Sequence, residues 1–88
     1  MVMTAHAIKR SFQRGIGENL IRLALEWGFE ATYNNVSIYF LSKSLLNKIA
    51  RVGNLNYQNY SHGIKVVVEE DDNTILTVSW TTSQKFHK

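Results

Sequence analysis

The sequence predicts an α+β fold, in which an N-terminal helical hairpin packs on a twisted antiparallel sheet. Apolar residues recur at helical spacing up to Trp27, and β-branched or alternating runs dominate the chain beyond it. Glycine and asparagine separate the segments, because the chain contains no proline. Helices followed by antiparallel hairpins are typical of folds that place helices on one face of a sheet. We therefore expect two helices, two strands, a helix and two strands, in that order.

Length and composition predict one small domain. The chain has 88 residues, of which 44% are hydrophobic and 19% charged, as is ordinary for a globular fold. It has no cysteine, which excludes a disulfide framework and a thiolate metal site. No apolar run is long enough for a membrane span, and no apolar signal segment follows residues 1–4. We expect a cytoplasmic domain over residues 1–88, without membrane contact, that ends in a polar and basic tail at 83–88.

Two helices open the chain. Thr4 is a suitable N-cap for a first helix that runs to about Arg14, and Gly15 supplies the left-handed residue that ends it. A second helix follows and ends at Gly28. Its apolar residues lie nearly all round, so we expect it to be deeply buried. Ile16 is expected to fill the seam between the two helices.

Two hairpins and a third helix make up the remainder. Asn34 and Asn35 tolerate the positive φ of a tight turn, which predicts the first hairpin. Ser42 is a suitable cap for the third helix, and residues 70–73 form the turn of the second hairpin. The expected strands cover residues 29–33, 36–41, 64–69 and 74–82, and the expected third helix covers residues 43–52.

A basic stripe on the first helix is the strongest candidate site. Residues four apart lie on nearly the same side of a helix, so His6, Arg10 and Arg14 form one stripe. Guanidinium groups can hold a phosphate there, and an imidazole beside them can move a proton. The apolar residues of this helix have the spacing of a separate, buried face: Ala5, Ile8 and Phe12. The alternatives are a solvated basic face, or an architectural role in which His6 and Arg10 hydrogen-bond to the sheet.

The charge distribution favours an anionic partner. The formal net charge is +3, and four of the seven acids are consecutive, from Glu69 to Asp72. Eight Lys/Arg side chains and only three acids precede this acidic turn. Such asymmetry favours a polyanionic partner or an acidic protein partner. The acidic turn lacks the pattern of a calcium loop, and three scattered histidines form no known metal-ligand set, so we expect no metal and no small-molecule cofactor.

The opening of the chain combines His-Ala-x-x-Arg at residues 6–10 with Arg-Gly-Ile at 14–16 and a helix that ends at Gly28. Ile-Tyr-Phe-Leu-Ser-Lys at 38–43 and a closing hairpin around an acidic turn follow. This pattern resembles a widespread family of small bacterial domains of unknown function, allied to toxin–antitoxin toxins of the RelE, ParE and BrnT type. The resemblance covers about residues 4–82.

The resemblance implies a RelE-like fold and metal-independent endoribonuclease activity, with RNA as substrate and an acidic antitoxin or immunity protein as partner. Toxins of this type stabilise the scissile phosphate with basic residues and move protons with histidine, lysine or tyrosine. It therefore implies catalytic roles for His6 and Arg10. The implied RNA- or phosphate-binding residues are Arg14, Lys43, Lys85 and His87. ParE-type relatives, by contrast, poison gyrase and cleave nothing.

The chain departs from the toxin pattern at three places. No clear strand precedes the helices, and a helix lies between the second and third strands. Trp80-Thr-Thr82 stands where an arginine or histidine is expected. A non-catalytic module that binds nucleic acid or an acidic protein is therefore the alternative function, and a scaffold with its interaction surface elsewhere is the third. Tyr57 and Tyr60 either stack on unpaired bases or anchor their loop.

Overall fold

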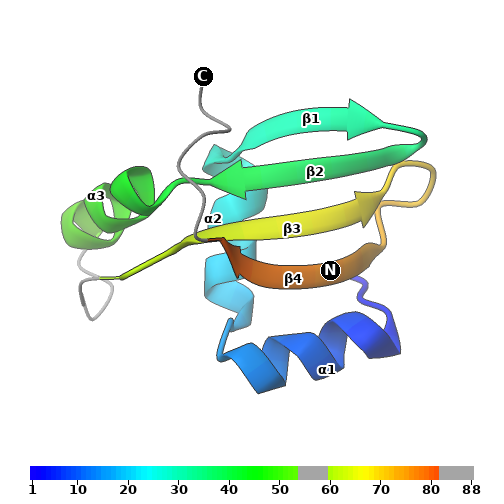
Figure 1. Ribbon diagram of the computed structural model, residues 1–88, viewed down its shortest axis with the longest axis horizontal. Helices are drawn as coiled ribbons and strands as arrows, with labels where there is room; N and C mark the ends of the chain where they lie inside the picture. Colours follow the sequence, from blue (N-terminus) through cyan, green and yellow to red (C-terminus); the bar gives the residue numbers. More distant parts are fainter. Residues whose placement is uncertain (54–59, 82–88) are drawn as a thin grey trace.

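The chain folds as three helices and a four-stranded antiparallel sheet (Figure 1), which confirms the predicted α+β class. This computed structural model describes residues 1–53 and 60–81, so the predicted tail and most of the loop before the third strand lie outside it. The elements are α1 (Ala5–Arg14), α2 (Glu18–Trp27), β1 (Phe29–Tyr33), β2 (Val36–Leu41), α3 (Lys43–Gly53), β3 (Gly63–Glu69) and β4 (Ile75–Thr81).

Short-range signals set the ends of α1 and the turn of the first hairpin, as predicted. The Ala7 N–H donates a hydrogen bond to Thr4 Oγ1 at 3.0 Å, and Gly15 ends α1 with a φ of 65°. Asn34 and Asn35 have φ values of 51° and 66°, the two positive values that a type I′ turn requires. These elements therefore begin and end where a nearby side chain accepts a backbone N–H hydrogen bond or where a residue adopts a positive φ.

The sheet is a meander, in which each strand pairs with the next along the chain. At the β4 edge, the first residues of the chain add a parallel bridge between Met3 and Ile75. The Ile75 N–H donates to the Val2 carbonyl at 2.9 Å, and the Thr4 N–H donates to the Ile75 carbonyl at 3.0 Å. A single bridge does not make a strand. The described residues before α1 therefore form no strand, as expected, but they do pair with β4 at one position.

The core lies between the sheet and the two N-terminal helices. α1 packs on β4, and α2 packs on β2 and β3, while α3 contacts β3 at the end of the sheet (Figure 1). Ile16 is completely buried in the turn between α1 and α2, as predicted. The other members of the buried apolar cluster are Ala7, Ile21, Ala24, Leu41, Leu46, Ile64, Val66, Val68, Ile75 and Val78.

The orientation of α1 differs from the prediction. The three residues expected to be buried are all exposed: Ala5, Ile8 and Phe12. Phe12 is 83% exposed, whereas Ala7, on another face of the helix, is fully buried. The cap residue helps to fix this rotation, because Thr4 Oγ1 also donates to the Leu76 carbonyl of β4 at 3.2 Å. The predicted buried stripe is therefore wrong, and α1 turns its largest apolar side chains outward.

α2 is buried on one side and not all round. Ile21 and Ala24 are fully buried against the sheet, but Trp27 is 55% exposed. On the outer side, Arg22 Nη2 forms a salt bridge with Glu18 Oε2 at 2.7 Å, one turn apart. The expected deep burial is therefore found on the sheet side of α2 and is wrong for its outer side, which the described chain does not cover.

The other face of the sheet carries apolar side chains that α1 and α2 do not cover. Because side chains alternate along a strand, Val36, Ile38 and Phe40 of β2 lie opposite the buried Leu41 side. In the register of the first hairpin, Phe29 pairs with Phe40 and Tyr33 pairs with Val36. These residues therefore share one face, which we call the outer sheet face.

Candidate functional site

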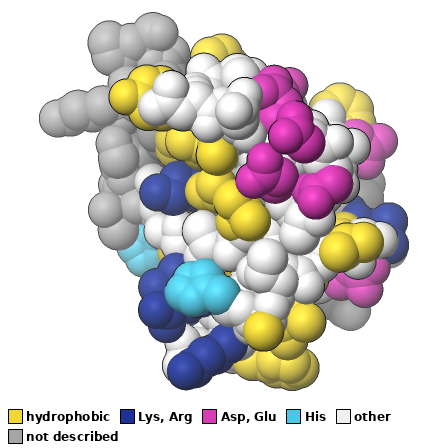
Figure 2. Space-filling model, turned by 90° about the vertical axis from the view of Figure 1, so that its right-hand side faces the viewer, with side chains coloured by type: hydrophobic (Ala, Val, Ile, Leu, Met, Phe, Trp, Pro, Cys, Tyr) yellow, Lys and Arg dark blue, Asp and Glu magenta, His cyan; other side chains and the backbone are white. Residues whose placement is uncertain are grey.

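α1 presents a basic surface without a single acidic residue. His6 and Lys9 are exposed and Arg10 is half-buried. Figure 2 shows that most acidic side chains of one face lie in its upper right part, whereas a group of basic side chains and histidine lies in its lower left part. Within residues 1–53 and 60–81 the salt bridge is Arg22–Glu18, so the cations of α1 are not neutralised by an ion pair there. This surface is suited to an anionic ligand.

His6 and Arg10 are positioned by the helix as the sequence predicts. They lie four residues apart in α1, a spacing at which Cβ atoms are about 5–6 Å apart. Arg10 Nη1 donates to Gln13 Oε1 at 2.7 Å, which directs the guanidinium along the helix surface. A guanidinium has five N–H donors, so four of them remain for a phosphate.

Arg14 has a second role that the sequence does not reveal. Its Nη1 donates to the Val78 carbonyl of β4 at 2.9 Å, and its own carbonyl accepts from Trp80 Nε1 at 2.7 Å. Trp80 in turn stacks on Tyr60, with ring centroids 6.3 Å apart. The last residue of α1 therefore ties the helix to the final strand, and only the remaining donors of its guanidinium are available to a ligand.

Of the other predicted RNA-binding residues that the structure describes, Lys43 is not brought to this surface. Lys43 is exposed at the start of α3, a helix that contacts β3 beyond the end of the sheet, whereas α1 packs on β4 (Figure 1). Lys85 and His87 lie outside the residues that the structure describes, as does Tyr57. The backbone of Tyr60 is held by Asn47, whose Oδ1 accepts from the Tyr60 N–H at 2.7 Å. This bond favours the anchoring role for Tyr60 over base stacking.

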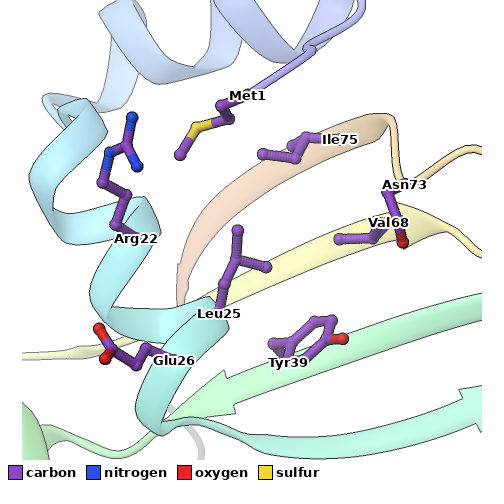
Figure 3. Close-up of a pocket in the computed structure, with 8 residues that line it drawn as sticks. All are labelled: Met1, Arg22, Leu25, Glu26, Tyr39, Val68, Asn73 and Ile75. Carbon is purple, nitrogen blue, oxygen red and sulfur yellow. The ribbon is translucent and has the colours of Figure 1, made fainter.

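A groove of about 470 Å³ lies on the helix side of the sheet, away from the predicted residues (Figure 3). Its lining comes from the N-terminus, α2, three strands and the β3–β4 turn: Met1, Arg22, Leu25, Glu26, Tyr39, Val68, Asn73 and Ile75. Leu25, Val68 and Ile75 point into its centre, and the carboxylate of Glu26 points away (Figure 3). None of the candidate catalytic residues lines it. The groove is thus a separate feature from the basic surface of α1.

Tyr39, which lines this groove, has a raised pKa. Burial raises the pKa of the Tyr39 phenol above its usual 10.0, and the charge and hydrogen bond of Glu30 on the neighbouring strand add to the effect. Glu30 also accepts a hydrogen bond from Ser37 at 3.0 Å. The phenol is therefore held in its neutral form, as a hydrogen-bond donor and not as a base.

Two further observations concern metal ligands and membrane-spanning helices. In the described part of the chain, no cluster of three or more His, Asp or Glu side chains is arranged to hold a metal ion. No helix there is both long and apolar enough to cross a membrane. The groove could not be predicted from the sequence, because six separate segments contribute to it. The outer sheet face was visible as alternation in β2, but alternation does not show which face a helix covers.

The chain matches no protein-family model, no curated protein and no solved structure. The function must therefore be inferred from the chemistry of the molecule itself.

Proposed function

We propose that this chain binds RNA through the basic surface of α1. The observation that carries the proposal is the arrangement of His6, Lys9 and Arg10, which lie on a helix without acids and outside any ion pair in the described residues. Phosphate oxygens accept hydrogen bonds from guanidinium and ammonium groups, and these contacts dominate the affinity for nucleic acid. The acidic residues at 69–72 lie at the end of β3 and in the turn that follows it, and within the described residues they form no ion pair with α1.

The more specific form of the proposal is toxin-type, metal-independent endoribonuclease activity. His6 would move the proton of the attacking 2′-hydroxyl, and Arg10 would stabilise the charge that develops on the scissile phosphate. The spacing of these two residues on one helix turn supports it, as does the resemblance of the opening motif. Lys43 is a weaker candidate for this site, because it belongs to a different helix.

A non-catalytic binding module is the second candidate, and two observations favour it. Arg14 uses one guanidinium donor and its carbonyl in hydrogen bonds to β4. In addition, no residue of α1 lines the groove around Tyr39. A cleavage site normally encloses the reacting atoms, whereas a phosphate can bind to an open helix surface. An acidic protein partner would use the same cations.

The test of binding compares two double variants that lose the same charge. Lys9→Ala/Arg10→Ala removes two cations from α1, and Lys48→Ala/Arg51→Ala removes two exposed cations from α3. Fluorescence anisotropy with a labelled single-stranded RNA, repeated over a salt series, gives the affinity and its salt dependence. We expect the α1 variant to lower the salt slope by about 1.4, since each phosphate contact on a single strand contributes about 0.7. Equal losses in both variants would mean that only net charge matters, and would refute the α1 surface.

The test of cleavage uses end-labelled RNA in the presence of a chelator. His6→Ala should retain RNA binding and lose product formation. Expression of the wild-type chain in bacteria should arrest growth, and expression of His6→Ala should not. Binding by the wild-type chain without products would establish the non-catalytic module instead. Products from the His6→Ala/Arg10→Ala variant at the wild-type rate would exclude this site.

A further inference from the structure

The two edge strands of the sheet, β4 and β1, differ in what lies beside them. At the β4 edge, Met3 forms a bridge with Ile75, and α1 packs on the strand. At the other edge, β1 pairs with β2 on one side, and no strand lies on its outer side within the described part of the chain. An edge strand exposes backbone donors and acceptors that can pair with another chain, and proteins usually protect such edges with charged side chains, especially lysine, or with proline or a bulge.

Of these protections β1 carries one charged side chain, Glu30. Its sequence, Phe-Glu-Ala-Thr-Tyr, contains no lysine or proline, and its register with β2 is uninterrupted over all five residues. Phe29 is 63% exposed and Tyr33 is 70% exposed, although both are large aromatic residues. Two exposed aromatic rings on an edge strand without lysine, proline or a bulge indicate an interaction surface.

The hairpin determines which backbone groups point outward. Because Asn34-Asn35 is a two-residue turn, Tyr33 and Val36 form a hydrogen-bonded pair, and bonded and non-bonded pairs then alternate along β1. The backbone groups of Tyr33, Ala31 and Phe29 therefore face β2. The N–H and C=O groups of Glu30 and Thr32 face away from it and are available to a new strand.

We propose that β1 is the interface of a homodimer, in which two copies pair antiparallel about a two-fold axis at Ala31. In this register Glu30 lies opposite Thr32 of the second copy, and the outward N–H and C=O groups of these two residues match. Phe29 lies opposite Tyr33 of the second copy, in the non-hydrogen-bonded pairs where side chains approach most closely. The two sheets become one, and their outer faces become continuous.

Other registers and other surfaces fit a second copy less well. A shift that centres the pairing on Glu30 would place two carboxylates directly opposite each other, which is destabilising. A shift that centres it on Thr32 would leave Phe29 without a partner on the strand. Docking through the exposed Phe12 on α1 would bring Lys9 and Arg10 of both copies together. Pairing about Ala31 uses the whole strand and opposes no like charges directly.

The association is expected to be moderate, because two five-residue strands bury less surface than a standard interface. Sedimentation equilibrium over a concentration series should show a monomer–dimer equilibrium. Thr32→Glu places a carboxylate opposite Glu30 of the second copy, and Thr32→Lys places an ammonium there. Since Thr32 is exposed in the monomer, both variants keep the fold. We expect the dissociation constant to rise about 3- to 10-fold in the first and to fall by a similar factor in the second.

A cross-linking experiment tests the register directly. The chain has no cysteine, so a single one can be introduced. Ala31→Cys places two thiols opposite each other at the two-fold axis, where Cα atoms are about 4.5 Å apart and a disulfide can form. Thr32→Cys is the matched control, because its thiol lies opposite Glu30 and not opposite another thiol. Mild oxidation should join most of the Ala31→Cys chains and few of the Thr32→Cys chains.

Several results would overturn the proposal. These are a wild-type chain that stays monomeric at the highest soluble concentration, Thr32→Glu and Thr32→Lys variants that shift the equilibrium in the same direction, or equal cross-linking at both cysteine positions. Circular dichroism of each variant checks that the monomer fold is intact. No RNA is used, so the outcome is separate from that of the proposed function.

Discussion

Replacing Phe12 with alanine should leave the stability of this protein almost unchanged, although Phe12 has the helical spacing of a core residue. Its side chain is 83% exposed, and surface substitutions usually change the free energy of unfolding by no more than about 0.5 kcal/mol. Alanine is also the better helix former, which offsets part of any loss. If α1 packed as its apolar spacing indicates, the same change would cost about 3–5 kcal/mol.

The matched variant is Ile16→Ala, four residues further along. Ile16 is completely buried between α1 and α2, so removing three of its carbons should cost about 2–5 kcal/mol. Urea denaturation followed by circular dichroism measures both free energies of unfolding, with the wild-type chain as reference. A cost above about 2 kcal/mol for Phe12→Ala, or one below about 1 kcal/mol for Ile16→Ala, would refute the observed orientation of α1.

Two further predictions concern polar contacts. Arg14→Met removes the donor to the Val78 carbonyl and should lower the free energy of unfolding, measured by urea denaturation, by about 1 kcal/mol. Arg10→Met breaks no hydrogen bond to the sheet and should change it by no more than about 0.5 kcal/mol. Similar losses in both variants would contradict a stabilising hydrogen bond between α1 and β4. Because the Tyr39 pKa is raised in the fold, its proton stabilises the folded state below the unfolded pKa of about 10, and this contribution is lost as the pH rises through the folded pKa. Tyr39→Phe should therefore lose less stability between pH 9 and pH 11 than the wild type, and parallel curves would exclude the shift.

Local signals in the sequence are sufficient for the elements of this fold but not for their orientation. Thr4, Gly15 and the Asn34-Asn35 turn act on backbone groups within four residues, so the ends of α1 and of the first hairpin follow from nearby residues. The rotation of α1 depends on bonds to β4 more than 60 residues away, such as that between Arg14 and Val78. Periodicity in a helix shows that one face is apolar, but it does not show which face a distant strand contacts.

The candidate site also combines residues whose positions follow from local sequence with features that depend on distant segments. His6 and Arg10 share a helix, so their spacing alone places them side by side. Lys43 was expected to join them, but it begins a helix that packs elsewhere on the sheet. The groove around Tyr39 and the outward groups of β1 depend on strand pairing between separate segments, which no short motif encodes.

The contact between α1 and β4 joins the first helix of the chain to its last strand. During synthesis, α1 is made long before residues 75–81, so it has no docking partner until β4 has been made. Closing a loop of this length is costly in entropy, and contacts between distant segments usually form late. The hairpins and α2 can associate first, because their partners are nearer in the chain. We therefore expect α1 to dock in the final step of folding, so that a ribosome-bound chain lacking β4 remains sensitive to proteases at its N-terminus.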